Sequence, residues 1–142
     1  MTNQINTTVI MKTFYTIMLL TIGQSLSAQQ SLTELQPSKE YENILVEKLT
    51  TDEYASCYVI WVKKEVTAHK HEHHTENLYI IDGSGKMLLG NKTIQVKAGD
   101  FVTIPHGTIH SVKVTSEIPL KVMSVQAPEF LGKDRVFLSN GF

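Results

Sequence analysis

The sequence predicts an all-β fold, a small antiparallel β-barrel or jelly roll. Apolar segments of strand length recur about every ten residues between turn signals, and no long stretch has the periodicity of an amphipathic helix. A chain of 142 residues allows one domain with a real hydrophobic core. Its net charge of −1 argues against a nucleic-acid partner or an anionic membrane surface, which would require a basic excess.

Residues 1–28 are predicted to be a secretory signal peptide, with Met11 as an alternative translation start. Lys12 is the only charged residue before Glu34, and residues 13–22 are apolar or hydroxylic. A run of about ten residues is too short to cross a bilayer, and small residues follow it where cleavage is expected. We therefore expect an exported protein, periplasmic or extracellular, without a stable membrane anchor. The alternative is an uncleaved amphipathic tail.

The mature chain divides into three predicted parts. Residues 29–40 are polar and should form a lead-in arm, and the barrel is expected over 41–127. Residues 128–142 form a tail whose Phe130 and Phe137 are expected to pack on the barrel. Turn residues, mainly glycine and proline, separate the predicted strands. These strands are 43–50, 55–64, 77–82, 86–89, 93–97, 101–104, 109–115 and 120–127.

All six histidines of the chain lie in two short blocks, at residues 69–74 and 106–110. Neutral imidazole is the commonest metal ligand in proteins, so this clustering indicates a metal site. In a strand, His69 and His71 share one face. Glu76 has the opposite parity, so the chain must bend or bulge before Glu76 can return to that face. Three imidazoles and one carboxylate suit a first-row divalent metal.

The two blocks resemble the two sequence motifs of the cupin superfamily, over roughly residues 40–127. The first motif, G-x5-H-x-H-x(3,4)-E-x6-G, is matched by His69, His71, Glu76 and Gly83. The second, G-x5-P-x-G-x2-H-x3-N, is matched by Gly99, Pro105, Gly107 and His110. Two positions depart from the family pattern: Lys63 replaces the first glycine and Val114 replaces the terminal asparagine. Neither is a ligand position in the family.

The resemblance implies a cupin-like double-stranded β-helix, often dimeric, that holds one divalent transition metal: Fe, Mn, Zn, Ni or Cu. The ligands it implies are His69, His71, Glu76 and His110.

His73 is a rival ligand because it also has H-x-H spacing with His71, but it leaves only two residues before Glu76, fewer than the family spacing. His73 and His74 are therefore expected in a loop or behind the ligands. His106 and Glu72 are expected to be exposed.

A metal with four protein ligands keeps open positions if it is five- or six-coordinate, as catalysis requires. The resemblance makes a dioxygenase acting on a small molecule the first hypothesis. A metal-dependent isomerase, decarboxylase or lyase is an alternative, and so is a non-enzymatic module that binds a carboxylate or a sugar. No catalytic base can be identified. Tyr58, Trp61 and Gln126 are candidates to line a pocket, with core packing the simpler role. Cys57, the only cysteine, is expected to pack as a small buried residue.

Two predicted strands are apolar on both faces, which predicts self-association. Leu78 and Ile80 share the inward face with Glu76, yet Tyr79 and Ile81 on the opposite face are also large and apolar. The strand around Trp61 repeats the pattern. A homodimer would cover such outer faces and protect sheet edges. The alternative cover is the C-terminal tail.

Overall fold

The computed structural model describes residues 29–138, so the predicted signal segment, residues 1–28, lies outside the described residues, as do residues 139–142. Contacts divide the chain into two units, Met1–Gln30 and Ser31–Phe142, and the fold belongs to the second. Residues 29–138 contain no helix that is long and apolar enough to cross a membrane. The ten strands of these residues are β1 (Ile44–Thr51), β2 (Ser56–Val62), β3 (Glu65–His71), β4 (Thr75–Asp82), β5 (Ser84–Leu89), β6 (Lys92–Lys97), β7 (Phe101–Ile104), β8 (His110–Val114), β9 (Leu120–Ala127) and β10 (Arg135–Phe137).

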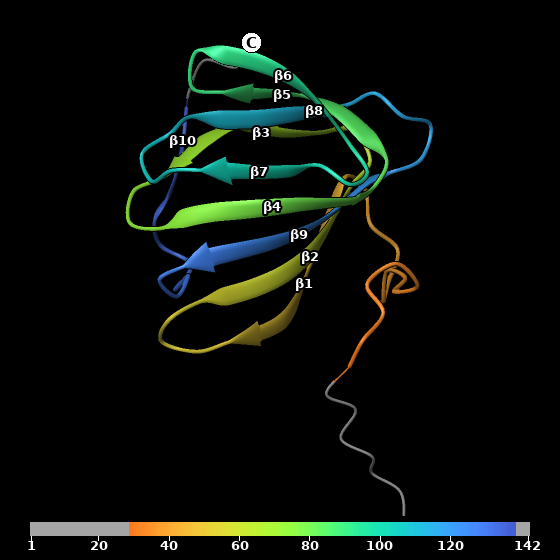
Figure 1. The fold of residues 1–142 in the computed structure, drawn as a ribbon, viewed down its shortest axis with the longest axis horizontal. Coiled ribbons are helices and arrows are strands. Elements are labelled where there is room, and N and C mark those ends of the chain that lie inside the picture. The colour runs from red at the N-terminus through yellow and green to blue at the C-terminus, as the bar shows by residue number, and fades with distance from the viewer. Residues whose placement is uncertain (1–28, 139–142) are drawn as a thin grey trace, which may run out of the picture. The chain divides into compact units, whose positions relative to one another are not determined.

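The strands form two antiparallel sheets (Figure 1). The first sheet has the order β1-β2-β9-β4-β7, and the second has the order β10-β3-β8-β5-β6. β3, which carries His69 and His71, and β4, which carries Glu76, therefore lie in different sheets. The predicted all-β fold class is confirmed, and every strand expected from the sequence overlaps an observed one. Two observed strands, β3 and β10, were not among the strands predicted from the sequence.

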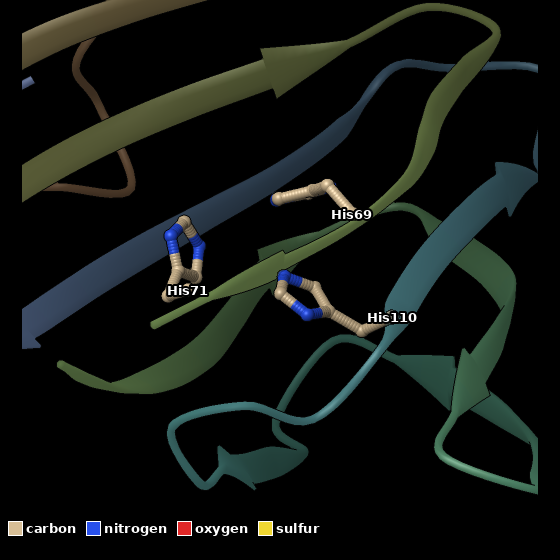
Figure 2. A group of neighbouring side chains, drawn as sticks. All are labelled: His69, His71 and His110. Atoms are coloured by element: carbon tan, nitrogen blue, oxygen red, sulfur yellow. The ribbon is translucent and has the colours of Figure 1, made fainter. Parts of the chain in front are cut away.

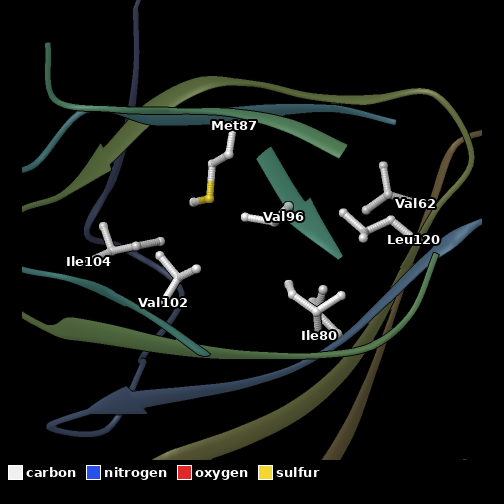
Figure 3. Close-up of a cluster of buried hydrophobic side chains, with 8 residues drawn as sticks. Val62, Ile80, Met87, Val96, Val102, Ile104 and Leu120 are labelled. Atoms are coloured by element: carbon white, nitrogen blue, oxygen red, sulfur yellow. The ribbon is translucent and has the colours of Figure 1, made fainter. Parts of the chain in front are cut away.

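The hydrophobic core fills the space between the two sheets (Figure 3). Strand alternation produces it: on β7, Val102 and Ile104 are buried, whereas Phe101 and Thr103 point outward and are exposed. Burying each such aliphatic side chain stabilises the fold by about 1.5–3 kcal/mol. The buried members of the core are Val62, Ile80, Met87, Val96, Val102, Ile104, Leu120 and Val122.

The outer face of β2 is covered by the lead-in arm. Val59 and Trp61 are 0% and 4% exposed, and residues of the arm and of β1 pack against them. The buried ammonium of Lys121 holds the arm in place, because Nζ donates to the carbonyl oxygens of Thr33 at 3.3 Å and Leu35 at 2.6 Å. For this face, the expectation that a second subunit or the C-terminal tail provides the cover was wrong. Polar arm residues around Leu32 and Leu35 concealed the apolar contacts that the arm makes.

The C-terminal tail joins the second sheet. β10 pairs with β3 so that Arg135 lies opposite His71 and Phe137 lies opposite His69. Without β10, β3 would be an edge strand with unpaired backbone groups. Phe130 lies farther back in the tail, where its backbone N–H donates to Ser56 Oγ at 3.0 Å. The tail is thus attached to β3 in the second sheet and to β2 in the first sheet.

Gly83 makes the tight connection between β4 and β5. Its φ is +77°, and a Cβ at this position would lie 2.7 Å from the carbonyl oxygen of Pro119, so only glycine fits. Lys63 replaces a motif glycine without this problem, because no non-glycine residue among the described ones has a positive φ. Lys63 Nζ instead donates to the carbonyl oxygen of Tyr41 at 2.7 Å. Val114, the other departure, packs against the core.

Candidate metal centre

Three buried histidines on neighbouring strands of the second sheet lie close together. His69 and His71 lie on β3, and His110 lies on β8, where the sheet register places it opposite His69. One ring nitrogen from each residue lies within 4.8 Å of the others, a separation that a single metal ion can bridge. Figure 2 shows the three rings directed toward one another from their two strands. The three residues are only 2–4% exposed.

Backbone carbonyls orient two of these rings. His69 Nδ1 lies 2.8 Å from the carbonyl oxygen of Thr67, and His110 Nδ1 lies 3.0 Å from that of Thr108. A carbonyl only accepts hydrogen bonds, so each Nδ1 carries the proton and each Nε2 presents its lone pair to the site. Nε2 of His110 and Nε2 of His71 are buried without a hydrogen-bond partner among the described residues.

Glu76 approaches the histidines from the other sheet. The loop between β3 and β4 carries the chain from one sheet to the other. Glu76 therefore faces the histidines despite its opposite strand parity, as the sequence predicts. Glu76 Oε2 lies 3.3 Å from His110 Nε2 and 3.5 Å from His71 Nε2. Its other oxygen accepts hydrogen bonds from Ser124 Oγ at 2.5 Å and Gln126 Nε2 at 3.0 Å, both on β9.

Lone pairs of imidazole and carboxylate that face each other at this distance repel unless a cation lies between them. A shared proton would relieve one such contact, whereas a divalent metal would relieve all of them at once. Two buried nitrogens without partners are costly in a folded protein, and a metal ion would satisfy both. The residues present therefore fit a divalent metal.

The ionisation states favour the same occupant. Burial, followed by the neighbouring His110, lowers the pKa of His69 to about 4, so its lone pair is free at neutral pH. Burial opposes the ionisation of Glu76, but contacts with His110, His71 and Ser124 outweigh it and hold its pKa well below the ordinary value. A neutral imidazole and an ionised carboxylate are the forms that bind metals. The four-residue ligand set stays a prediction, and the structure brings its members together.

The remaining histidines take different places. His74 is 2% exposed, and its Nδ1 lies 2.7 Å from Asp134 Oδ2 in the tail. His71, His74 and Asp134 form a second group whose ligand atoms lie within 4.8 Å of one another. His73 and His106 are exposed. Asp134 was not predicted as a site residue, because it follows no motif and reaches the site only through the pairing of β10 with β3.

Gln126 is the second residue whose role the sequence did not settle. It was expected in the core or lining a pocket, and the structure shows it buried with its amide on Glu76. Tyr58 is buried beside Phe130, with ring centroids 6.5 Å apart. Trp61 faces the arm on the opposite side of the sheet, so it packs and does not line the site. Cys57 is half-buried.

Aromatic rings of the tail cover the histidines. The Phe130 ring lies edge-on to His71 and His74, with centroid distances of 6.2 and 5.4 Å. The Phe137 ring lies 5.7 Å from that of His69. These apolar groups exclude water from one side of the site, which strengthens electrostatic interactions within it.

The chain belongs to the cupin superfamily. Residues 57–126 match the profile of the Cupin domain family. The fold is similar to that of an uncharacterized conserved protein with a double-stranded β-helix domain from Klebsiella pneumoniae, with a TM-score of 0.66 and 22% sequence identity. That similarity covers 80% of this chain and 99% of the Klebsiella chain.

Two relatives with named activities share only a part of their length with this chain. Quercetin 2,3-dioxygenase of Bacillus subtilis is 35% identical over 63 residues, which are 44% of this chain and 18% of that enzyme. Mannose-1-phosphate guanylyltransferase 2 of Escherichia coli O157:H7 is 33% identical over 66 residues, which are 46% of this chain and 14% of that enzyme. The two names describe different chemistry, so the similarity shows a shared domain and not a shared reaction.

Proposed function

We propose that this chain is an exported, metal-dependent cupin enzyme that acts on a small molecule, with dioxygenase-type chemistry as the first choice. The observation that carries the proposal is that Nε2 of His71 and Nε2 of His110, both buried and without a hydrogen-bond partner among the described residues, face the ionised carboxylate of Glu76. Such a donor set suits one first-row divalent metal. Because quercetin 2,3-dioxygenase shares this domain, its reaction is the first one to test.

Each residue around the site has a defined part in this proposal. His69, His71, Glu76 and His110 would hold the metal. When bound, Fe, Mn, Ni or Cu would supply Lewis-acid and one-electron chemistry, whereas Zn would supply Lewis-acid chemistry alone.

Other groups prepare the ligands. Ser124 and Gln126 donate to Glu76 and keep its carboxylate fixed and ionised. The carbonyl groups of Thr67 and Thr108 fix the ring orientation of His69 and His110. Phe130 excludes water from the side on which the tail lies.

Export bears on the identity of the metal. A chain that crosses the membrane unfolded binds its metal outside the cytoplasm, where the affinity order of divalent ions favours copper and zinc over iron. Fe, Mn, Zn, Ni and Cu all stay candidates. The similarity to a mannose-1-phosphate guanylyltransferase favours a second candidate function, in which the metal site binds a sugar ligand without redox chemistry.

Metal analysis of the protein from its native compartment tests the site. We expect one metal per chain in the wild type and much less after alanine replacement of His69, His71, Glu76 or His110. His73→Ala and His106→Ala are matched controls, because both side chains are exposed. If His69→Ala kept full metal and His73→Ala lost it, the ligand register would be wrong.

The reaction is tested separately, with quercetin as the probe. Metal-free protein is loaded under anaerobic conditions with each candidate metal in turn, and oxygen uptake is then recorded. Oxygen consumption that requires both the metal and the probe supports a dioxygenase. Metal binding without oxygen uptake by any form, combined with binding of mannose by calorimetry, would favour the sugar-binding candidate.

A further inference from the structure

Asp134 connects the C-terminal tail to the histidine-rich loop through several contacts. Its Oδ2 lies 2.7 Å from His74 Nδ1 and accepts from the backbone N–H of His73 at 3.2 Å. Its backbone carbonyl accepts from the N–H of Glu72 at 3.1 Å. Its Oδ1 lies 3.6 Å from His71 Nδ1 and has no hydrogen-bond partner among the described residues. Asp134 is 9% exposed, so this carboxylate is buried against the site.

The position of Oδ1 matters because of what His71 must do as a ligand. An imidazole that binds a metal through Nε2 carries its proton on Nδ1, and that N–H requires an acceptor. His69 and His110 have backbone carbonyls for this purpose. Nδ1 of His71 lies 3.6 Å from Asp134 Oδ1, and both atoms are buried without a hydrogen-bond partner among the described residues. A carboxylate in this place orients the ring and makes it a stronger donor to the metal.

We propose that Asp134 is a positioning residue for His71, and that it couples metal binding to the docking of residues 128–137 against the barrel. The proposal rests on the proposed function in one respect, namely that His71 is a metal ligand.

The coupling follows from where Asp134 lies in the chain. The segment 128–137 includes Phe130, whose ring covers His71 and His74, and it continues into β10, which pairs with β3. When Asp134 is in place the segment is docked and the site is covered. By thermodynamic linkage, docking must raise the affinity for metal by the same factor by which metal favours docking. Loss of such a supporting group typically lowers metal affinity roughly 10–100-fold.

Zinc affinity and trypsin cleavage measure the two sides of this coupling on the mature protein. Zinc is the probe metal, and its affinity is determined by competition with a chromophoric chelator. Lys133 and Arg135 are exposed residues of the docked segment, so the rate of tryptic cleavage after them, followed by intact mass, reports opening of the segment. We expect zinc to slow this cleavage roughly 10–100-fold in the wild type.

The key variant is Asp134→Asn, which keeps the shape of the side chain and removes its charge, with Asp134→Ala as the more severe change. We expect both to bind zinc roughly 10–100-fold more weakly and to lose the zinc-dependent protection. Glu129→Ala is the matched control, because it alters the same segment at a residue whose carboxylate accepts a hydrogen bond from Thr51 Oγ1 at 3.3 Å, away from the histidines. It should keep wild-type affinity and protection. Thermal unfolding of each metal-free variant shows whether it is folded.

Three results would overturn this proposal while leaving the metal site of the proposed function intact. Equal zinc affinity in folded Asp134→Asn and Glu129→Ala would remove the positioning role. Zinc binding to the wild type without slower cleavage would remove the coupling. Two zinc ions per wild-type chain and one in Asp134→Ala would make Asp134 a ligand of a second metal. A wild type that binds no zinc or other candidate metal would instead refute the metal site itself, and the proposal with it.

Discussion

Acid should destabilise the metal-free protein through His69. This imidazole is 3% exposed, and burial next to His110 lowers its pKa to about 4. In the unfolded chain the same group titrates near 6.5. At a pH between these two values, His69 is protonated in the unfolded chain but stays neutral in the folded protein. The free energy of unfolding is therefore intact above pH 6.5 and falls as the pH drops toward 4.

The size of the effect follows from the two pKa values. For one group that titrates at about 4 when folded and about 6.5 when unfolded, the loss between pH 7.5 and pH 5 is about 2 kcal/mol. This is a large fraction of the roughly 5–15 kcal/mol that stabilises a typical domain. Burial also lowers the pKa of His74, which adds to the loss in the same direction. The lowered pKa of Glu76 adds a further loss below pH 4.5.

Urea unfolding of chelator-treated protein at several pH values measures this loss. The only tryptophan, Trp61, is 4% exposed and reports unfolding by its fluorescence. His69→Gln removes the titrating group, so its free energy of unfolding should fall by about 2 kcal/mol less than that of the wild type between pH 7.5 and pH 5. His73→Gln, at an exposed position, should behave like the wild type. Equal losses in wild type and His69→Gln would refute the reasoning.

Three further predictions concern other parts of the chain. Gly83→Ala should lower the free energy of unfolding by about 2 kcal/mol or more, because a Cβ there meets backbone at 2.7 Å. Gly99→Ala, with φ of +93° and nothing within 4 Å, should cost less in the same urea titration. Intact mass of protein from the native host should show cleavage within residues 25–30, and a mature species that keeps residue 1 or 11 would exclude a signal peptide. Tyr79 and Phe101 are cross-strand neighbours with 42% and 65% exposure, so light scattering at micromolar concentration should show a dimer that Phe101→Lys dissociates. A monomeric wild type would count against the dimer.

Short-range patterns in the sequence were sufficient for the fold class and for the core of the site. Turn residues such as Gly99, Pro105 and Pro119 act through local backbone preferences, so segments such as 101–104 and 120–127 could be located between them. His69 and His71 share one face because they are two residues apart in a strand. Glu76 reaches them through the short loop that carries the chain from one sheet to the other. The positive φ of Gly83 likewise reflects a turn formed by its own neighbours.

Contacts between distant segments were decided by the tertiary structure alone. Gln126 reaches Glu76 because β9 pairs with β4, and Asp134 reaches His71 and His74 because β10 pairs with β3. The arm covers Trp61 because Lys121 binds two of its carbonyl groups. A glutamine, an aspartate or a lysine in a sequence gives no local sign of such a partner. These side chains acquire their roles only when the fold brings together residues 50 or more positions apart.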